Sequence, residues 1–429
     1  MSFMIDVICD PESVHVWERT SSQVSEIGEG AINGKEFLFY AEQEGKRGIC
    51  FGRKEGELLS HLFCEARKRE KKIPILYFLN CYGADLKEKT AALDSYANVF
   101  KEFVACGEDQ LQIAVIVGNC VGGSAYLAAM CDIILFSGPD GNLCLTGPKI
   151  VQSFMGENCR KEELGGVEIH SANGTIAHTF CGSRDCAEKL DILLSAYYQI
   201  DQPEKAPAYQ LENSIVPMSN KAYDIHRIID GLIDSGTWLE TAPGYAPNLV
   251  TGFARIGGMN VGIFANQPQA LAGTIDCDAS EKGERFLKNC KKLRLPLLVI
   301  SDVPSFMPGI EQERNGIEIK GAGLLKAMIR LDTVKLTLIL HKSFGGAYIV
   351  MNSVRLGADR VYAWPGSTIG IMGEGMARAL SKNPNSWNEN MGLSAEENLN
   401  NKSLSGIIFP EETRYTLISD FRNLKNRKN

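Results

Sequence analysis

Two glycine pairs, Gly122-Gly123 and Gly345-Gly346, are the residues whose type and position best predict chemistry in this sequence. Each pair follows a strongly apolar run, LQIAVIVGN or VKLTLILHK, and precedes a segment that reads as a buried helix. A strand, a glycine turn and a helix leave unpaired backbone N–H groups at the helix N-terminus, where they stabilise a negative oxygen. Glycine also lets a ligand oxygen approach the main chain closely. We therefore predict an oxyanion hole at each pair, aimed at a carbonyl that becomes an enolate.

A purely structural role is the alternative interpretation of these glycines. A glycine pair permits tight packing of a helix against the strand before it, and a single pair favours that explanation. Two pairs at matched positions instead favour two oxyanion holes. Two holes on duplicated domains would handle two carbonyls face to face.

The chain repeats itself. Residues 28–43 (GEGAINGKEFLFYAEQ) align with residues 252–267 (GFARIGGMNVGIFANQ) at an offset of 252 − 28 = 224, and each copy predicts a β-hairpin. The strands that begin after Pro74 and Pro296 are 222 residues apart, and the glycine pairs are 345 − 122 = 223 residues apart. Landmarks in one order at one spacing indicate a duplicated domain.

Strands and helices alternate within each copy, which indicates an α/β fold with mostly parallel sheets flanked by helices. The segment 201–217 (DQPEKAPAYQLENSIVP) is polar and contains proline, so it predicts a boundary near residue 215. We therefore expect two domains, 1–215 and 216–429, each carrying one glycine pair.

Composition excludes several classes of function. The chain of 429 residues has a formal net charge of 45 − 52 = −7, which disfavours a nucleic-acid binder. Its longest apolar stretch, 124–136, contains Asp132 and is shorter than the ~20 residues of a membrane-spanning helix. The 13 cysteines form no CxxC pair, and the histidines show no ligand spacing, although His341 lies just before the second glycine pair. Because no signal pattern opens the sequence, we expect a cytoplasmic protein with reduced thiols. Because no ligand spacing is present, we expect no metal.

Longer motifs resemble the carboxyltransferase (β) subunits of biotin-dependent acyl-CoA carboxylases, such as propionyl-CoA carboxylase. The most specific are LTGPKIV (145–151), EELGGVEIHSANGTIAH (162–178), NQPQALAGTID (266–276), DVPSFMPGIEQERNGI (302–317), and KSFGGAYIVMNS with YAWPGSTIGIMG (342–373). The resemblance covers nearly the whole chain. It implies two crotonase-like (ClpP/crotonase) domains, an active site at a domain interface usually formed between subunits, and a homo-oligomer, commonly a hexamer.

The resemblance also implies which backbone groups act. Gly122 and Gly123 match the hole for the acyl-CoA thioester oxygen, so the N-terminal domain is the acyl-thioester side. Gly346 and Ala347 match the hole for the biotin ureido oxygen, so the C-terminal domain is the biotin side. In this family, CO2 moves from carboxybiotin to the α-carbon of the thioester through an enolate. Both anions are oxygen-centred, so backbone dipoles can supply most of the stabilisation without a catalytic side chain.

The first active-site loop departs from the family pattern. Where the family usually has Gly-Gly-Ala-Arg, the loop Asn80–Asp85 places Tyr82 at a glycine position and Asp85 at the arginine position. Near residue 373, Glu374 follows where the family commonly has a small residue and lysine. Such changes should weaken the binding of an anionic substrate, unless these loops simply tolerate drift. The residues that we expect to contact the acyl substrate are Tyr82, Gly83, Ala84 and Ile349.

Three functions remain open at this stage. The first is the carboxyltransferase subunit of an acyl-CoA carboxylase. It would need a separate biotin carboxylase and biotin carrier, because the chain has no Met-Lys-Met attachment site and no ATP-binding glycine loop. The second is a biotin-independent decarboxylase or acyltransferase acting on a malonyl-type thioester of CoA or an acyl carrier protein, which the altered loop favours. The third is a catalytically silent subunit of a carboxylase, which the two intact glycine pairs disfavour.

Overall fold

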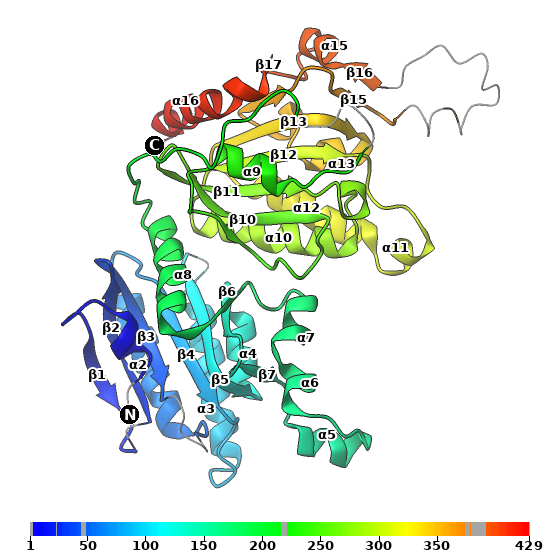
Figure 1. Ribbon diagram of the computed structural model, residues 1–429. Helices are drawn as coiled ribbons and strands as arrows, with labels where there is room; N and C mark the ends of the chain where they lie inside the picture. Colours follow the sequence, from blue (N-terminus) through cyan, green and yellow to red (C-terminus); the bar gives the residue numbers. More distant parts are fainter. Residues whose placement is uncertain are drawn as a thin grey trace. The chain divides into compact units, whose positions relative to one another are not determined.

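The structure is a computed structural model that describes residues 3–22, 24–43, 49–107, 109–215, 221–373, 378 and 392–428. The chain divides into two compact units, Met1–Tyr198 (unit 1) and Gln199–Asn429 (unit 2), each with its own sheet (Figure 1).

Unit 1 is built on one twisted sheet whose strands lie in the order β1-β2-β3-β4-β5-β6-β8, with β7 beside β5. Strands β1 to β3 pair antiparallel, whereas β3, β4, β5, β6 and β8 pair parallel. The strands are β1 (His15–Arg19), β2 (Ser25–Ile32), β3 (Lys35–Glu42), β4 (Ile75–Cys81), β5 (Gln112–Val121), β6 (Ile133–Ser137), β7 (Asn142–Cys144) and β8 (His178–Phe180).

Helices cover the sheet of unit 1. Helix α2 buries Leu59, Leu62 and Phe63 in a core with Tyr40 and Tyr77 from the central strands. The helices are α1 (Ile5–Ile8), α2 (Arg53–Lys68), α3 (Thr90–Ala105), α4 (Gly123–Met130), α5 (Pro148–Met155), α6 (Lys161–Gly165), α7 (Val167–Ala172) and α8 (Gly182–Tyr197). Helix α5 has no buried residue and projects from the rest of unit 1 (Figure 1).

Unit 2 repeats this plan with the order β16-β15-β13-β12-β11-β10-β9, and with β14 between β13 and β17. Its strands are β9 (Leu239–Glu240), β10 (Leu249–Ile256), β11 (Met259–Asn266), β12 (Leu297–Val303), β13 (Lys335–Phe344), β14 (Arg360–Ala363), β15 (Thr368–Gly370), β16 (Gly392–Ser394) and β17 (Gly406–Ile407). Its α-helices are α9 (His226–Leu232), α10 (Cys277–Lys292), α11 (Ile310–Arg314), α12 (Ile317–Arg330), α13 (Gly345–Val350), α15 (Ala395–Asn400) and α16 (Pro410–Lys428), and its 3-10 helices are η1 (Leu271–Gly273) and η2 (Val354–Leu356).

The predicted hairpins are confirmed. Strands β2 and β3 turn at Asn33 (φ 47°) and Gly34 (φ 71°), and β10 and β11 turn at Gly257 (φ 60°) and Gly258 (φ 83°). Positive φ at both central residues gives the turn that matches the twist of paired strands. The strands predicted after Pro74 and Pro296 are β4 and β12, which are equal in length. The expected tandem α/β fold with mostly parallel sheets is therefore confirmed.

The segment at the start of unit 2 packs on unit 2. Gln202 N donates to Gly258 O (2.9 Å), and Ala208 N donates to Asp230 O (3.1 Å). Helix α16 holds the same segment, because Arg414 donates to Lys205 O (2.6 Å). The sequence placed a boundary near residue 215 from this polar stretch, whereas the compact units divide at Tyr198.

A buried ion pair secures α16 within unit 2. Arg414 Nη2 lies 2.6 Å from Asp234 Oδ1, and the Asp234 side chain is only 1% exposed. The same carboxylate accepts hydrogen bonds from Gly257 N (2.9 Å) and Gly258 N (2.8 Å), so it also holds the β10–β11 turn. In the described part of the chain, no helix is both long and apolar enough to cross a bilayer.

We predict that Arg414→Ala lowers the free energy of unfolding by about 2 kcal/mol, because it leaves the buried Asp234 carboxylate short of its charged partner. Arg422→Ala is the matched control, since Arg422 lies on the same helix as Arg414. It bonds Glu204 and Gly257 O, but its side chain is 53% exposed. Arg422→Ala should cost less than about 1 kcal/mol. Urea titration of both variants measures this; equal losses would contradict the prediction.

Candidate functional site

The first glycine pair forms the turn that the sequence predicted. Strand β5 ends at Val121, Gly122 takes φ 67° and ψ −124°, and helix α4 begins at Gly123. Gly122 N donates to Cys144 O (3.1 Å), and Gly122 O accepts from Ala125 N (3.1 Å). Residues other than glycine rarely adopt this backbone conformation. Because residue 122 is glycine, the strand can pass into the helix within a single residue.

The loop after β4 lies beside this turn. A Cβ placed on Gly122 would lie 3.7 Å from the Cα of Gly83. Phe51 fixes the loop backbone, because Phe51 N donates to Gly83 O and Asp85 N donates to Phe51 O, both at 2.8 Å. Among the residues that the structure describes, the N–H groups of Ala84 and Gly123 have no protein acceptor. Two amides in neighbouring segments are therefore available to a ligand oxygen.

The second glycine pair forms a similar turn in unit 2. Strand β13 ends at Phe344, Gly345 takes φ 60°, and α13 begins at the same glycine. Gly346 is exposed at the start of this helix, and Ala347 is fully buried, so the Ala347 methyl packs inward. Both helices are less buried than the sequence predicted, because Tyr126 on α4 and Ile349 on α13 are 54% and 46% exposed.

The surroundings of the two turns also correspond. Tyr126 and Ile349 are 223 residues apart, and each lies three residues after the second glycine of its pair. Leu145 follows β7 and Ile371 follows β15, and both are exposed large apolar side chains (60% and 69%). Each turn is thus bordered by exposed apolar side chains.

The structure brings the predicted residues of unit 1 together. Tyr82, Gly83 and Ala84 lie on the loop beside the Gly122–Gly123 turn, and Tyr82 is 45% exposed. In unit 2, Gly346, Ala347 and Ile349 share α13, and the exposure of Ile349 argues against a role in the core. Glu374 lies outside the described residues.

One residue at this loop was not singled out from the sequence. Asn119, near the end of β5, donates from Nδ2 to the Tyr82 hydroxyl (2.9 Å). The duplication offered a signal, because Asn119 aligns with Lys342 at the offset of the glycine pairs. Asp85, the other departure from the family pattern, accepts a hydrogen bond from Lys87 N (2.9 Å) within its own loop.

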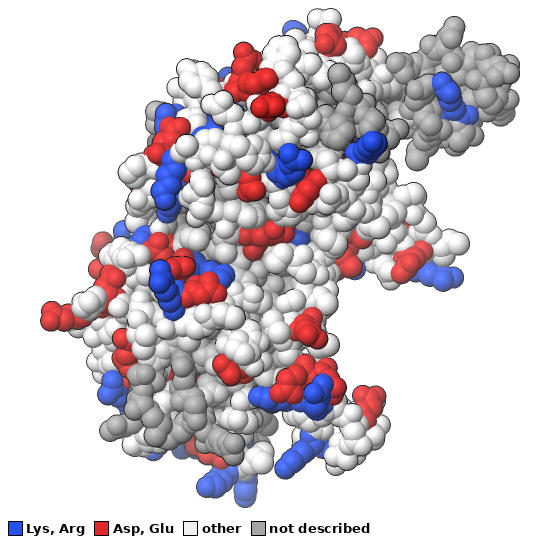
Figure 2. All heavy atoms as spheres, viewed as in Figure 1, with Lys and Arg blue, Asp and Glu red and all other residues white. Residues whose placement is uncertain are grey.

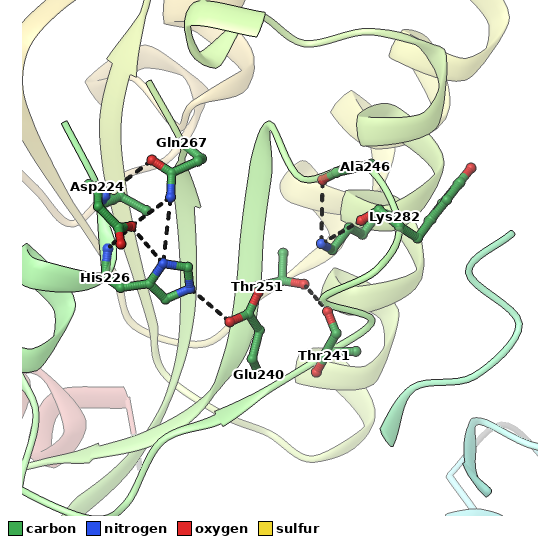
Figure 3. A network of polar contacts seen from close by, with 10 residues as sticks. Asp224, His226, Glu240, Thr241, Ala246, Thr251, Gln267 and Lys282 are labelled. Atoms are coloured by element: carbon green, nitrogen blue, oxygen red, sulfur yellow. Dashed lines mark hydrogen bonds and ion pairs between the residues drawn. The ribbon is translucent and has the colours of Figure 1, made fainter. Parts of the chain in front are cut away.

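Two ionisable side chains of unit 2 with shifted pKa values, His226 and Lys282, belong to a network of polar contacts (Figure 3). His226 bonds Asp224 through Nδ1 and Glu240 through Nε2, both at 2.8 Å, and the Glu240 hydrogen bond chiefly raises the pKa of His226 to about 9. Burial lowers the pKa of Lys282 to about 8, and its ammonium donates to Tyr245 O (2.8 Å). These contacts explain His226 as a structural cation.

Charge and metal-binding groups are dispersed. On the face drawn in Figure 2, acidic and basic side chains are interspersed rather than gathered by sign. Within the described ranges, no three His, Cys, Asp or Glu side chains are grouped so that they could hold a metal ion.

Comparison with known proteins identifies the family. Residues 20–415 match the carboxyl transferase domain family. The chain belongs to this family. It is 36% identical to a putative propionyl-CoA carboxylase beta chain of Bacillus subtilis over 426 residues, covering 93% of this chain and 83% of the relative. It is 33% identical to the methylmalonyl-CoA decarboxylase subunit alpha of Propionigenium modestum over 360 residues, covering 81% of this chain and 69% of that protein.

A solved structure supports the same assignment. The transcarboxylase 12S hexamer, determined with methylmalonyl-coenzyme A bound, superposes with a TM-score of 0.89 and 29% identity, covering 99% of this chain and 89% of that one. The resemblance that the sequence motifs indicated is therefore confirmed, as is the duplicated crotonase-like fold of this carboxyltransferase.

The two glycine pairs differ in what surrounds them, and this difference predicts unequal costs of substitution. A Cβ on Gly123 would lie 2.6 Å from the Tyr96 ring, whereas a Cβ on Gly346 would lie 3.6 Å from Phe306. We predict that Gly123→Ala lowers the free energy of unfolding by about 1–3 kcal/mol through overpacking. Gly346→Ala should change it by less than about 1 kcal/mol, since alanine favours helices. Denaturant unfolding of both carboxyltransferase variants tests this, and equal costs would contradict it.

The His226 contacts predict a pH-dependent contribution to stability. Because folding raises the pKa of His226 from 6.5 to about 9, its charged contacts stabilise the fold fully below pH 6.5. That contribution is lost as the pH rises through 9. The midpoint of thermal unfolding should therefore be higher for wild type than for His226→Gln at pH 6.5. The two midpoints should converge by pH 10. A difference that stays constant across this range would contradict the prediction.

Proposed function

We propose that this chain is an acyl-CoA carboxyltransferase that transfers CO2 between carboxybiotin and the α-carbon of a short acyl thioester. The observation that carries the proposal is the pair of matching strand–glycine–helix turns in a member of the carboxyl transferase family. The named relatives act on propionyl-CoA or methylmalonyl-CoA according to their names, which supports a short acyl group.

Unit 1 holds the thioester in this proposal. The Gly123 and Ala84 N–H groups donate to the thioester oxygen, with Gly122 giving the oxygen room to approach. The hydrogen bonds strengthen as the α-carbon loses its proton and negative charge moves onto that oxygen. Tyr82, Tyr126 and Leu145 offer apolar surface beside the turn, which suits a small acyl group better than a charged one.

Unit 2 receives the biotin in this proposal. Gly346 is exposed, and a Cβ there would stand in ordinary contact with Phe306, so the backbone leaves room for a neutral ring to approach. The Gly346 and Ala347 amides belong to the first turn of α13, and in this proposal they donate to the ureido oxygen. Biotin, when bound in its carboxylated form, supplies the CO2 and a nitrogen that takes up the α-proton.

Partners follow from what the chain lacks in sequence. With no Met-Lys-Met attachment site and no ATP-binding glycine loop, we propose that a biotin carboxylase and a biotin carrier are separate proteins. We also propose assembly as a homo-oligomer, for which the hexameric transcarboxylase 12S is the precedent.

Decarboxylation without biotin is the second candidate. Asp85 stands where the family resemblance places an arginine. One relative is named as a subunit of a methylmalonyl-CoA decarboxylase, a name that supports decarboxylation and does not mention biotin. In that reaction the same unit 1 amides would hold the enolate formed when a malonyl-type thioester, of CoA or of a carrier protein, releases CO2. Neither of the two relatives named above is named as an acyltransferase or as a silent subunit.

We predict that the purified protein transfers the labelled free carboxyl group of methylmalonyl-CoA or malonyl-CoA to free biotin. The C–C bond to the carboxyl breaks, an N–C bond to biotin forms, and the biotin N–H proton moves to the α-carbon. Chromatography of labelled carboxybiotin measures the product. Gly346→Val should abolish transfer while leaving the fold intact, because its bulk covers the second turn.

The same assay decides between the candidates. Release of labelled CO2 at equal rates with and without biotin would favour the decarboxylase. No turnover of either CoA ester, with or without biotin, would contradict both.

A further inference from the structure

A fully buried carboxyl group lies beneath the first active-site loop. Glu42 is the last residue of β3 and is 1% exposed. Tyr40 donates its hydroxyl to Glu42 Oε1 (2.8 Å), and Asn80 donates its backbone N–H to Glu42 Oε2 (2.6 Å). Burial raises the pKa of Glu42 to about 7, which reflects the cost of placing a carboxylate here. An apolar side chain at this position would avoid the free-energy cost of burying a carboxyl group. The hydrogen bonds that Glu42 accepts are what an apolar side chain could not provide.

Hydrogen bonds continue from Glu42 to the exposed end of the loop. The Asn80 side chain donates to Gln43 O (2.9 Å) and accepts from Asn119 N (3.1 Å). Asn119 then donates from its side chain to the Tyr82 hydroxyl (2.9 Å). The chain of contacts therefore runs from β3 through β4 and β5 to Tyr82. We call these four residues, Glu42, Asn80, Asn119 and Tyr82, the strand-end network.

The network acts where the backbone changes course. The register of β4 against β5 shifts at Asn80, because Leu79 pairs with Ile116 and Cys81 pairs with Cys120, so Asn80 alone faces residues 117–119 of β5. The loop with Gly83 and Ala84 follows directly. Gly118 makes room for Asn80, because a Cβ on Gly118 would lie 2.3 Å from Asn80 Oδ1. The Asn80 backbone N–H, at this irregular position, is the group that Glu42 binds.

Unit 2 contains the same arrangement with its charges placed differently. Asn266, Asp302 and Lys342 occupy the positions of Glu42, Asn80 and Asn119, at offsets of 224, 222 and 223. Asp302 N donates to Asn266 Oδ1 (3.3 Å) at a matching shift in register, between Ser301 and Val303. Lys342 Nζ lies 3.7 Å from Asp302 Oδ1. The contact from the strand-end N–H to the side chain on the neighbouring strand therefore occurs in both units of the duplicated fold.

We propose that Glu42 is a positioning residue, which holds the Asn80–Asp85 loop so that its amides meet the thioester oxygen. The catalytic part of this inference rests on the proposed function; the ordering of the loop does not. Amides stabilise an oxyanion only when they are held close to the productive geometry, so a small displacement of the loop is costly. Glu42 itself does not contact the substrate.

The test compares variants of the network with a matched control. Glu42→Ala leaves the Asn80 N–H and the Tyr40 hydroxyl unpaired, whereas Glu42→Gln keeps an oxygen for the Asn80 N–H. We expect Glu42→Ala and Asn119→Ala to lower kcat for carboxyl transfer about tenfold or more, with KM changed less than about threefold. Glu42→Gln should restore most of kcat. Tyr77→Phe is the control, because it removes a buried hydrogen-bonding group of β4 that bonds Gln112 rather than the loop. This variant should leave kcat unchanged.

Hydrogen exchange of a peptide covering residues 79–86 provides a readout that needs no activity. Exchange should be faster in Glu42→Ala and Asn119→Ala than in wild type or Tyr77→Phe. The inference would be overturned if the peptide exchanged at the wild-type rate in both Glu42→Ala and Asn119→Ala. It would also be overturned if Tyr77→Phe lowered kcat as much as these variants do. If Glu42→Ala fails to fold, Asn119→Ala, altered at the loop end of the network, decides. If the wild type transfers no carboxyl group, the proposed function fails and exchange alone judges the loop.

Discussion

The structure depends on one backbone constraint: a strand must become a helix within a single residue. Gly122 and Gly345 meet it by adopting positive φ, so that α4 and α13 begin almost where β5 and β13 end. The short turn leaves the N–H of Gly123, in the first turn of α4, without a protein acceptor in the described part of the chain, with the loop after β4 alongside. The rest of each unit, from hairpin to covering helices, fixes the strand that delivers this turn.

Much of the fold followed from the sequence, because the signals were local and occurred twice. The hairpins at Asn33-Gly34 and Gly257-Gly258, the strands after Pro74 and Pro296, and both glycine turns are where the pattern predicted them. The segment near residue 201 was harder to interpret. Its polar composition is typical of a linker, yet it packs on unit 2 through contacts with the β10–β11 turn and α16. Those partners are far away in sequence, so composition does not reveal them.

The candidate site was predictable only in its backbone. Gly123 and Gly346 stood out by type and spacing, while Glu42 and Asn119 did not, because neither belongs to a motif of reactive residues. Their contacts arise from a shift in strand register at Asn80, which is a three-dimensional property. The exposure of Tyr126 was missed for a related reason, whereas Ile349 had been expected to contact the acyl substrate. An apolar residue on a short apolar helix predicts burial, and no local signal shows that the Tyr126 side chain stays 54% exposed.

The aromatic ring packed under the first turn has a consequence for how this site can change. Tyr96 stacks on Phe51 with ring centroids 4.0 Å apart and shares a 2.8 Å hydrogen bond with Ser124, so it has little freedom to move away from Gly123. Mutational routes that enlarge residue 123 must therefore first shrink residue 96 and give up its stacking. The second turn has no such lock. Over long divergence, we therefore expect the fold to accept a side chain at residue 346 more readily than at residue 123.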